Sequence, residues 1–438
     1  RIFDKSGNPV YSYFETEKHG FYAALPAPAE TPDAFVLTDN GILPPDEGLT
    51  YAGRTDAASG WTRSQNSDVY VLLPLGDAAT LRADFVTLTG RTDLSDIKTL
   101  GSWYSKWTNY TAAQKLAMIE RYRKENIPLD MIVIDTEWKN TSANGNDGDG
   151  TGYDINTALY ADMADFLRAA AEAGVRVLFN DHTHKTSLQI TNPTELKWQT
   201  NGILKLLCLG LDGWWYDRNW TYSIKSPFGD VLFSTLGQVL YHDTIRKYNA
   251  DAADGAPRRV LMLSNTDWIK HGHITGEPSV IGHRYGIQWS GDIYGDPLQL
   301  RREVENAVLA GVKGASPYLS SDLGGFWHND TVTKNHFIRW MQYGAFSPVT
   351  RVHSTLSCKN EQLPWSYGAD AQAIITDFLN MRYHLMPYYY MLARENYDTG
   401  MPLLRRLDFY YPQYKEAVDN TEYLIGKDIL VAPFTSTE

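Results

Sequence analysis

Cysteine is nearly absent from this sequence, because the chain of 438 residues contains only Cys208 and Cys358. Two cysteines cannot build a disulfide framework or a four-ligand zinc site, so each is expected to be a small buried apolar residue. Positive charge is scarce too, since 40 Lys and Arg stand against 52 Asp and Glu and the net charge is −12. Clustered Lys and Arg bind phosphate groups, so this balance argues against nucleic acid as a partner.

Long apolar runs are missing as well. No stretch of 18 or more apolar residues occurs, so no membrane span is expected. The opening stretch "RIFDKSGNPVYSYFETEKHG" lacks the basic head and apolar middle of a signal peptide, and the sequence stops at "DILVAPFTSTE". Both ends are expected to be cut from something longer. The compartment and the oligomeric state therefore stay open.

Three familiar catalytic and nucleotide-binding patterns are also absent. No G-x-G-x-x-G or G-x-x-x-x-G-K-[ST] phosphate loop follows a strand-like run. No G-x-S-x-G occurs, and the pair Ser320–Ser321 has no base nearby in the sequence, so a serine nucleophile is not favoured. Aromatic residues, by contrast, are abundant at 13%. They suit flat stacking surfaces as well as the core.

Strand and turn signals fill the first part of the chain, and the pattern changes near Leu100. Residues 1–95 predict an N-terminal β-rich, sandwich-like domain. Residues 96–400 alternate short apolar strands with amphipathic helices, and residues 401–438 predict the start of a C-terminal β-domain. The strands of the middle part are expected at 100–107, 129–138, 175–182, 211–220, 259–268, 285–292, 314–325 and 346–354.

Regular alternation of strand and helix predicts a parallel sheet in an α/β fold. Eight such units over about 300 residues suit a closed (β/α)₈ TIM barrel, which typically needs roughly 250 residues. Only the segment after the fifth strand has a weak helical pattern and reads equally as a loop. A doubly wound open sheet is the alternative, but the missing phosphate loops argue against it.

Carboxylates follow six of the eight expected strands, and aromatic residues surround them. In TIM barrels the active site lies at these C-terminal strand ends. Like charges on one mouth raise each other's pKa, so the set indicates function, although any single acid would equally suit a structural cap. In chain order the residues at strand ends are Trp103, Trp107, Asp135, Glu137, Trp138, Asn180, Asp181, His182, Trp215, Asp217, Arg218, Asn219, Trp220, Asn265, Asp267, Trp289, Asp292, Ser320, Ser321, Asp322, Arg351 and His353.

Carboxylates, tryptophan faces and few cations suit a neutral ligand with many hydroxyl groups. Glycosidic bonds are broken by such a pair of acids, one attacking and one protonated to donate to the leaving oxygen. The sequence therefore predicts a carbohydrate partner.

A metal site is the main chemical alternative. His182 and His184 form an H-x-H pattern, but such sites normally begin on the first strand, which has no histidine here. We therefore expect no metal, and a loosely bound Ca²⁺ at "GDGTGYD" (148–154) stays open.

Several stretches together carry a resemblance to a known family. "WWYDRNW", "HRYGIQWSGD", "LGGFWHNDTVTKNHFIRWMQYGAFSPVTRVHS" and "GKDILVAP" resemble segments of glycoside hydrolase family 31, whose members are retaining exo-α-glycosidases on (β/α)₈ barrels. The resemblance runs over nearly the whole chain. It implies hydrolysis of a terminal sugar without a metal or an organic cofactor.

The resemblance also implies roles for single residues. Asp217 would be the nucleophile and Asp292 the general acid/base. Asp135 would hold hydroxyl groups of the sugar in the −1 subsite, and His353 would contact another. The further candidates for substrate binding are Asp181, Trp215, Asn265, Arg284, Trp289, Asp322 and Arg351.

The segment around the nucleophile departs from the common α-glucosidase pattern W-x-D-M-N-E, with Arg218 after the acid and Trp220 at the usual acidic end. Ile293 stands where Asn is frequent, and an upstream sugar-binding Arg has no match in "IKHGHITGEPSVIG". Together with "FNDH" on the third strand, the segment resembles the branch acting on α-linked N-acetylgalactosamine. This sugar is the first expectation; an α-galactoside, an α-glucoside and an inactive glycan-binding homologue are the alternatives. An external glycan as substrate would favour a secreted or periplasmic location.

Overall fold

The computed structural model describes residues 23–39, 68–140, 152–182, 193–217, 235–251, 258–266, 268–327 and 332–436, together with short strands outside these ranges. Eight parallel strands form its central sheet, in the order β18-β17-β14-β11-β10-β9-β8-β19. Parallel bridges from Ser320 to Val349 and from Leu323 to Val352 join the two end strands and close the barrel. The strands are β8 (Ser102–Lys106), β9 (Met131–Ile134), β10 (Arg176–Asp181), β11 (Gly213–Tyr216), β14 (Met262–Asn265), β17 (Ile287–Trp289), β18 (Leu319–Ser320) and β19 (Thr350–Val352).

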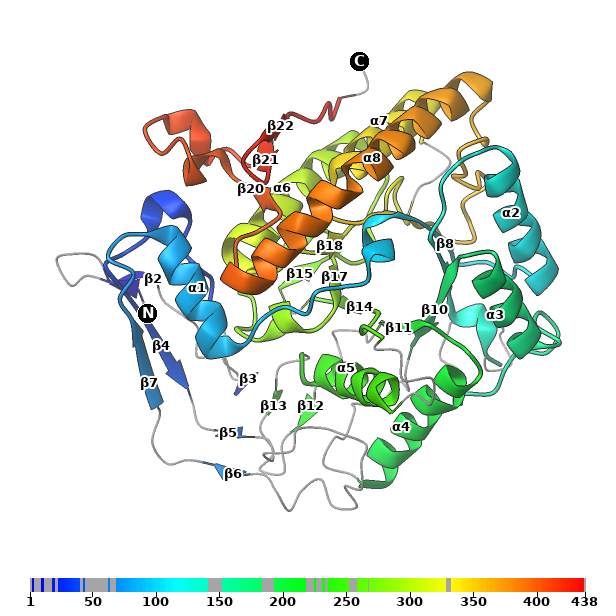
Figure 1. The fold of residues 1–438 in the computed structure, drawn as a ribbon, viewed down its shortest axis with the longest axis horizontal. Coiled ribbons are helices and arrows are strands. Elements are labelled where there is room, and N and C mark those ends of the chain that lie inside the picture. The colour runs from blue at the N-terminus through cyan, green and yellow to red at the C-terminus, as the bar shows by residue number, and fades with distance from the viewer. Residues whose placement is uncertain are drawn as a thin grey trace.

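Helices surround this barrel (Figure 1). The expected (β/α)₈ fold with eight parallel strands is thus confirmed. Thr111 and Gln114 form the predicted capping box before the first of these helices. The barrel helices are α2 (Ala112–Lys124), α3 (Met163–Glu172), α4 (Pro193–Cys208), α5 (Thr235–Ala250), α6 (Pro297–Gly314), α7 (Lys334–Phe346) and α8 (Ala369–Thr399).

The segment after the fifth strand contains no α-helix within residues 268–286. It forms a hairpin of β15 (Ile269–Lys270) and β16 (His273–Ile274), followed by the short 3₁₀ helix η4 (Gly282–Arg284). The weak helical pattern of this segment is thus explained by a loop. Other 3₁₀ turns are η1 (Pro28–Glu30), η2 (Ile97–Leu100), η3 (Thr136–Trp138), η5 (Leu407–Phe409) and η6 (Lys415–Val418).

Small antiparallel sheets lie before and after the barrel. The first contains β1 (Ile2–Phe3), β2 (Pro9–Tyr11), β4 (Ala34–Asp39) and β7 (Asp68–Leu72), and the last contains β20 (Leu404–Arg405), β21 (Tyr423–Ile425) and β22 (Ile429–Val431). Two further groups are β5 (Ile42–Leu43) with β6 (Thr62–Arg63), and β3 (Lys18–His19) with β12 (Ile224–Lys225) and β13 (Val231–Leu232).

A helix also lies within the stretch expected to be β-rich. Helix α1 (Ala78–Thr89) begins at Asp77, whose carboxylate accepts a hydrogen bond from the Ala79 amide. Its buried Phe85 packs at the edge of Phe35 from β4, with ring centroids 6.5 Å apart. The N-terminal part therefore mixes strands with a helix.

The barrel strands are buried on both faces, because helices cover the outside and side chains fill the inside. Successive side chains on a strand point to opposite faces. On β11 and β10, Trp214 and Phe179 therefore pack outward against Trp138, whereas Trp215 points inward, where its ring meets that of Trp289. This alternation decides which strand-end residues can reach a common site.

The two cysteines differ in their exposure to solvent. Cys358 is buried as expected, but the expectation for Cys208 was wrong, since this residue is exposed at the end of α4. In the part of the chain that the structure describes, no helix is both long and apolar enough to cross a membrane.

Candidate active site

Asp217 lies directly after β11 at the C-terminal end of the barrel, with its side chain inside. One carboxylate oxygen, Oδ2, contacts the His182 ring nitrogen Nε2 at 2.6 Å and accepts a hydrogen bond from Asn180 Nδ2 at 2.9 Å. Asn180 pairs with Trp215 in the parallel ladder of β10 and β11. Residues 180 and 182 therefore face the same side as Trp215 and Asp217, which brings both donors to the acid.

Asp217 and His182 stabilise each other's charged forms. Burial alone would raise the pKa of Asp217, but the positive His182, its hydrogen bond and that of Asn180 outweigh burial and lower the pKa. Burial disfavours the charged imidazole of His182, yet Asp217 raises the pKa of His182 to about 9. At neutral pH, Asp217 is therefore a carboxylate beside an imidazolium.

Asp292 follows β17 at the same end of the barrel. Burial and then the neighbouring acids Asp322 and Asp217 raise its pKa well above the ordinary value, and His182 opposes this only in part. The loop that carries it is held by a hydrogen bond between the His271 ring and the Asp292 backbone carbonyl, at 2.9 Å. A carboxyl group of this kind keeps its proton at pH values where Asp217 has lost its own.

Asp135 and His353 lie deeper in the barrel mouth. Asp135 follows β9, and one of its oxygens accepts a hydrogen bond from the Thr136 amide at 2.8 Å. The other lies 3.5 Å from His353 Nε2. Burial, reinforced by Asp217, raises the pKa of Asp135 to about 6, while burial and Arg351 hold the pKa of His353 well below its ordinary value. His353 is therefore a neutral imidazole here.

Aromatic rings form the wall beside these acids. Trp215 and Trp289 meet edge to face with ring centroids 4.7 Å apart, and Trp215 meets the His353 ring at 5.1 Å. His353 stacks on Phe326, and Phe326 stacks on the half-buried Trp107. This line of rings runs from the floor toward the surface and offers flat apolar faces of the kind that sugar rings stack on.

Arg351 and Asp322 support this wall from inside the barrel. Their side chains form an ion pair in which neither is exposed, and Trp289 Nε1 donates to the same Asp322 oxygen at 2.8 Å. The Arg351 guanidinium lies over the Trp215 ring, 4.9 Å from its centroid. Even so, burial raises the pKa of Asp322 to about 7. These two residues hold the tryptophans in place rather than facing open space.

Two sequence candidates do not join the site. The Asp181 carboxylate points outward, where Lys139 Nζ lies at 3.3 Å and the Tyr153 hydroxyl donates to it at 2.7 Å. Arg284 precedes β17 and so lies at the opposite end of the barrel, where it packs against Gly90: a Cβ added there would meet Arg284 Nε at 2.6 Å. We correct both assignments to substrate binding.

Asn265 lies at the end of β14, inside the barrel, and helps to lower the pKa of Asp217. Asp267 and residues 218–220, which the sequence also singled out, lie outside the described residues.

The sequence did not single out the contact that Asn180 and His182 make with Asp217. Alternation along β10 was the available signal, because it separates these two residues from Asp181. Lys115 is a second addition, since it is buried and interacts with Asp135 and with Glu137, which the sequence named only as a strand-end residue. The positive charge of Lys115 acts on Asp135 and Glu137, and burial raises the pKa of Glu137 well above normal.

The residues that could bind metal do not converge in the described part of the chain. There, no group of three or more His, Cys, Asp or Glu could hold a metal ion. His182 has its nitrogen at Asp217 instead, and His184 and residues 148–151 lie outside the described residues.

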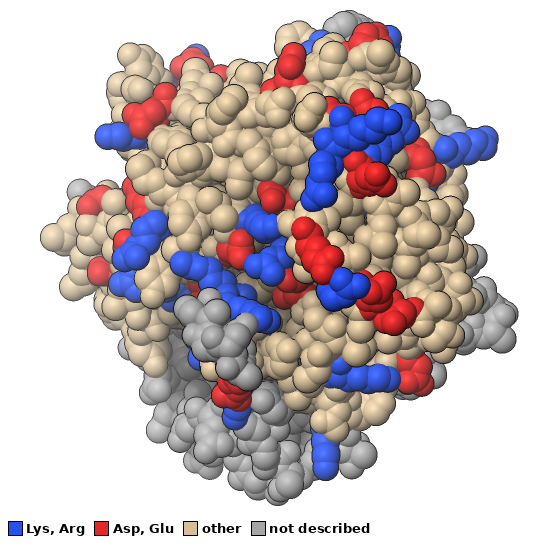
Figure 2. Space-filling model, turned by 45° about the vertical axis from the view of Figure 1, so that its right-hand side comes forward, with Lys and Arg blue, Asp and Glu red and all other residues tan. Residues whose placement is uncertain are grey.

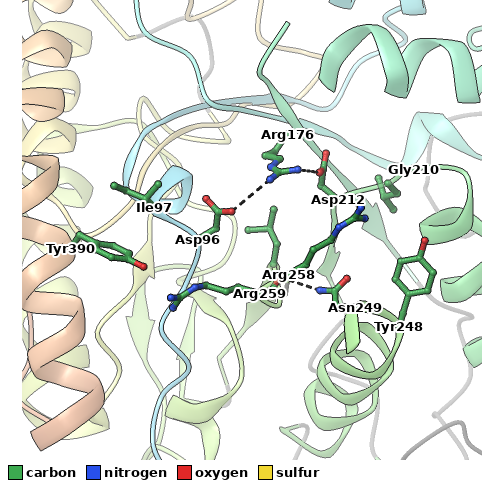
Figure 3. Close-up of a pocket in the computed structure, with 12 residues that line it drawn as sticks. Asp96, Ile97, Arg176, Gly210, Asp212, Tyr248, Asn249, Arg258, Arg259 and Tyr390 are labelled. Carbon is green, nitrogen blue, oxygen red and sulfur yellow. Dashed lines mark hydrogen bonds and ion pairs between the residues drawn. The ribbon is translucent and has the colours of Figure 1, made fainter. Parts of the chain in front are cut away.

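A pocket of about 370 Å³ opens at the other end of the barrel (Figure 3). Arg176 bridges Asp212, at 2.6 Å, and Asp96, at 3.7 Å. Such internal pairing at the N-terminal face is typical of stabilising interactions. On the face shown in Figure 2, basic and acidic side chains are likewise interleaved, and neither sign covers a large area.

Comparisons with known proteins identify the family of this barrel. The model described as "Glycosyl hydrolases family 31 TIM-barrel domain" matches residues 94–186 and 179–392. The chain is 26% identical over 378 residues to an α-xylosidase of Saccharolobus solfataricus, covering 80% of this chain and 50% of the relative. It is 24% identical over 411 residues to α-glucosidase 2 of Bacillus thermoamyloliquefaciens, covering 80% and 48%.

Solved structures show the same fold. A dextranase of Flavobacterium johnsoniae complexed with glucose superposes with a TM-score of 0.70 at 20% identity, covering 84% of this chain and 50% of that one. An α-xylosidase from a soil metagenome complexed with xylose gives 0.67 at 18% identity, covering 97% and 70%. The chain spans about half the length of the curated relatives it matches. The family match covers more than half of the chain, which therefore belongs to glycoside hydrolase family 31.

Proposed function

We propose that this chain carries the catalytic barrel of a retaining exo-α-glycoside hydrolase, with Asp217 as nucleophile and Asp292 as general acid/base. One observation carries the proposal: two acids at one barrel mouth have pKa values displaced in opposite directions. Such a separation assigns one acid to attack and the other to proton donation. Family membership supports the same reaction class.

The reaction proceeds by two displacements. In the first, an Asp217 oxygen forms a bond to the anomeric carbon, the glycosidic C–O bond breaks, and the Asp292 proton passes to the leaving oxygen. In the second, the Asp292 carboxylate takes a proton from water, whose oxygen attacks the anomeric carbon and releases Asp217. Each step inverts the carbon, so the product keeps the α configuration. The two carboxyl groups need a separation of about 5–5.5 Å for this path.

The other inward residues would bind the sugar. Asp135 accepts hydrogen bonds from hydroxyl groups, and the neutral His353 can donate or accept one. Trp215 and Trp289 would form the wall beside the sugar, and Asn265 would provide an amide beside the nucleophile. These groups are buried and fixed by their neighbours. A bound sugar would therefore displace water from the space between the two catalytic acids.

The sugar in the −1 subsite is proposed as glucose or xylose. The proteins named above are α-xylosidases, an α-glucosidase and a dextranase, which favours this reading over the N-acetylgalactosamine expected from the nucleophile segment. One observation keeps the α-N-acetylgalactosaminide as a second candidate. The "FNDH" segment that motivated it supplies Asn180 and His182, and both contact Asp217.

A panel of p-nitrophenyl α-glycosides tests the proposal. Purified protein is assayed with the glucoside, xyloside, galactoside and N-acetylgalactosaminide, and the anomeric form of the first product is followed by proton NMR. We expect release from at least one α-glycoside, with the α-anomer formed first. A β-anomer as first product would contradict retention, and sugar binding without any release would indicate an inactive glycan-binding protein.

A further inference from the structure

His182 and Asn180 make hydrogen-bond contacts with the same oxygen of Asp217. His182 Nε2 and Asn180 Nδ2 both meet Oδ2, at 2.6 and 2.9 Å, instead of dividing between the two carboxylate oxygens. The carboxylate is therefore held in one rotation about its terminal bond. The other oxygen, Oδ1, is then the candidate for forming the bond to the anomeric carbon.

The backbone that carries His182 is itself anchored. Lys139 Nζ donates to the His182 carbonyl at 2.7 Å and lies 3.3 Å from Asp181. Asp181 in turn accepts hydrogen bonds from the hydroxyl groups of Tyr153 and Tyr241. This buried network fixes the end of β10, so the position of the imidazole depends on groups outside the sugar site.

The charges around His182 favour its protonated form. Burial disfavours the imidazolium, but the charge of Asp217, its hydrogen bond and the charge of Asp135 outweigh burial and the opposing charge of Lys139. The side chain is still 34% exposed, so it borders the site instead of being sealed behind it. A cation in this place stabilises negative charge on Oδ2.

We propose that His182 is a positioning residue, which as an imidazolium holds Oδ2 of Asp217 and presents Oδ1 to the anomeric carbon. The inference rests on the proposed role of Asp217 as nucleophile. In the glycosyl-enzyme intermediate, Oδ2 becomes the carbonyl oxygen of the ester and keeps its contact with His182. When water displaces the sugar, the imidazolium stabilises the returning carboxylate. No proton leaves His182 in either step.

Substitutions of His182 test the inference on the intact chain. His182→Ala removes the contact, and His182→Gln keeps an uncharged donor. His273→Gln serves as matched control, because His273 is an exposed histidine on the hairpin and none of the proposed roles involves it. Turnover and KM are measured with the best nitrophenyl glycoside of the panel. Circular dichroism and thermal unfolding establish that each variant folds.

We expect kcat of His182→Ala to fall about 100-fold with KM changed less than threefold, as for the loss of one donor to a developing charge. His182→Gln should recover part of the loss. Added imidazole should partly rescue His182→Ala, and more strongly below pH 7 than above it, because the imidazolium is the active form. A structural role alone would not produce this pH-dependent rescue.

The outcomes separate the two proposals. A kcat for His182→Ala and His182→Gln within threefold of the parent would overturn the role of His182. Asp217→Ala is assayed in parallel. If it loses activity while both His182 variants keep theirs, the inference alone fails. If Asp217→Ala keeps the parental rate, the proposed nucleophile fails and the inference fails with it.

Discussion

The carboxyl groups of Asp217 and Asp292 influence each other across the barrel mouth, yet their pKa values move in opposite directions. Burial and the acids Asp322 and Asp217 raise the pKa of Asp292. His182 and Asn180 outweigh burial at Asp217 and lower its pKa. The difference comes from partners, since burial opposes the charged form of both acids. The cation and hydrogen-bond donors beside Asp217, and the acids beside Asp292, therefore create the division between nucleophile and proton donor.

The first prediction concerns the nucleophile. Asp217→Ala should lower kcat by about four orders of magnitude, because the covalent path is lost. Azide is small enough to take the place of the deleted carboxylate and should restore part of the rate by forming a β-glycosyl azide. Mass spectrometry and NMR of the product check this. An unchanged rate, or rescue that yields the α-azide, would exclude Asp217 as nucleophile.

The second prediction concerns the proton donor. Asp292→Ala should lose about 100-fold to 10,000-fold in rate with substrates whose leaving group needs a proton. With a dinitrophenyl glycoside, whose leaving group departs unprotonated, the first step should be nearly normal. Because Asp292 is also the base of the second step, the difference is measured as kcat/KM, which reports the first step, across leaving groups of graded pKa. An equal loss of kcat/KM with all leaving groups would contradict the role of Asp292.

The third prediction concerns pH. Asp217 must be ionised, and its lowered pKa places the acid limb of kcat/KM below the ordinary carboxyl value of 3.8. Asp292 must be protonated, so activity falls as the pH rises through its raised pKa. Asp292→Asn should remove this alkaline limb from the residual activity with a dinitrophenyl glycoside. A limb that persists unchanged in the variant would assign it to another group.

The fourth prediction separates inward from outward acids. Asp135→Asn should lower kcat/KM about 100-fold, because an acceptor for sugar hydroxyls is weakened inside the site. Asp181→Asn should stay within about tenfold of the parent but should destabilise the fold by about 3 kcal/mol, since Lys139 loses its buried partner. Kinetics and urea unfolding of both variants check this. The reverse pattern would restore Asp181 to the sugar site.

The fifth prediction concerns the buried pair Arg351–Asp322. Arg351→Met should destabilise the fold by about 3 kcal/mol, because it leaves Asp322 buried without its cation. The pKa of Asp322 is already about 7 and should rise further, so the cost should grow as the pH increases and the orphaned acid resists ionisation. Urea unfolding at pH 6 and pH 8 measures this.

Adding Asp322→Asn to Arg351→Met should recover much of that stability, in a double-mutant cycle. A cost that does not depend on pH, or a double variant less stable than additivity predicts, would show that the two charges do not act as a pair.

The barrel could be predicted from the sequence because its strands are short apolar runs and all but the fifth are followed by a helical pattern. Helix α1 could not, since its residues Ala78–Thr89 contain the strand-favouring residue types Thr, Val and Phe and follow a genuine strand. Its burial of Leu81, Phe85 and Val86 against β4 is what makes it helical. Tertiary packing overrode local preference there.

For the site, the sequence predicts which residues lie at the C-terminal ends of the barrel strands. Strand ends bring Asp217, Asp292 and Asp135 to one mouth, but they do not say which side of each strand a residue faces. Asp181 was assigned wrongly for that reason, and the sequence named His182 as a strand-end residue and weighed it as a metal ligand without linking it to Asp217. Arg284 precedes its strand, so topology alone would have placed it at the other end.

Covalent trapping tests the central claim most directly. A 5-fluoroglycosyl fluoride of the preferred sugar should inactivate the protein by one equivalent, since fluorine at carbon 5 slows both displacements while the anomeric fluoride, a good leaving group, keeps the first one fast enough for the intermediate to accumulate. Peptide mapping should then place the sugar on Asp217 as an ester. A label on Asp292 or Asp135 would contradict the account, as would turnover of the reagent without any covalent species.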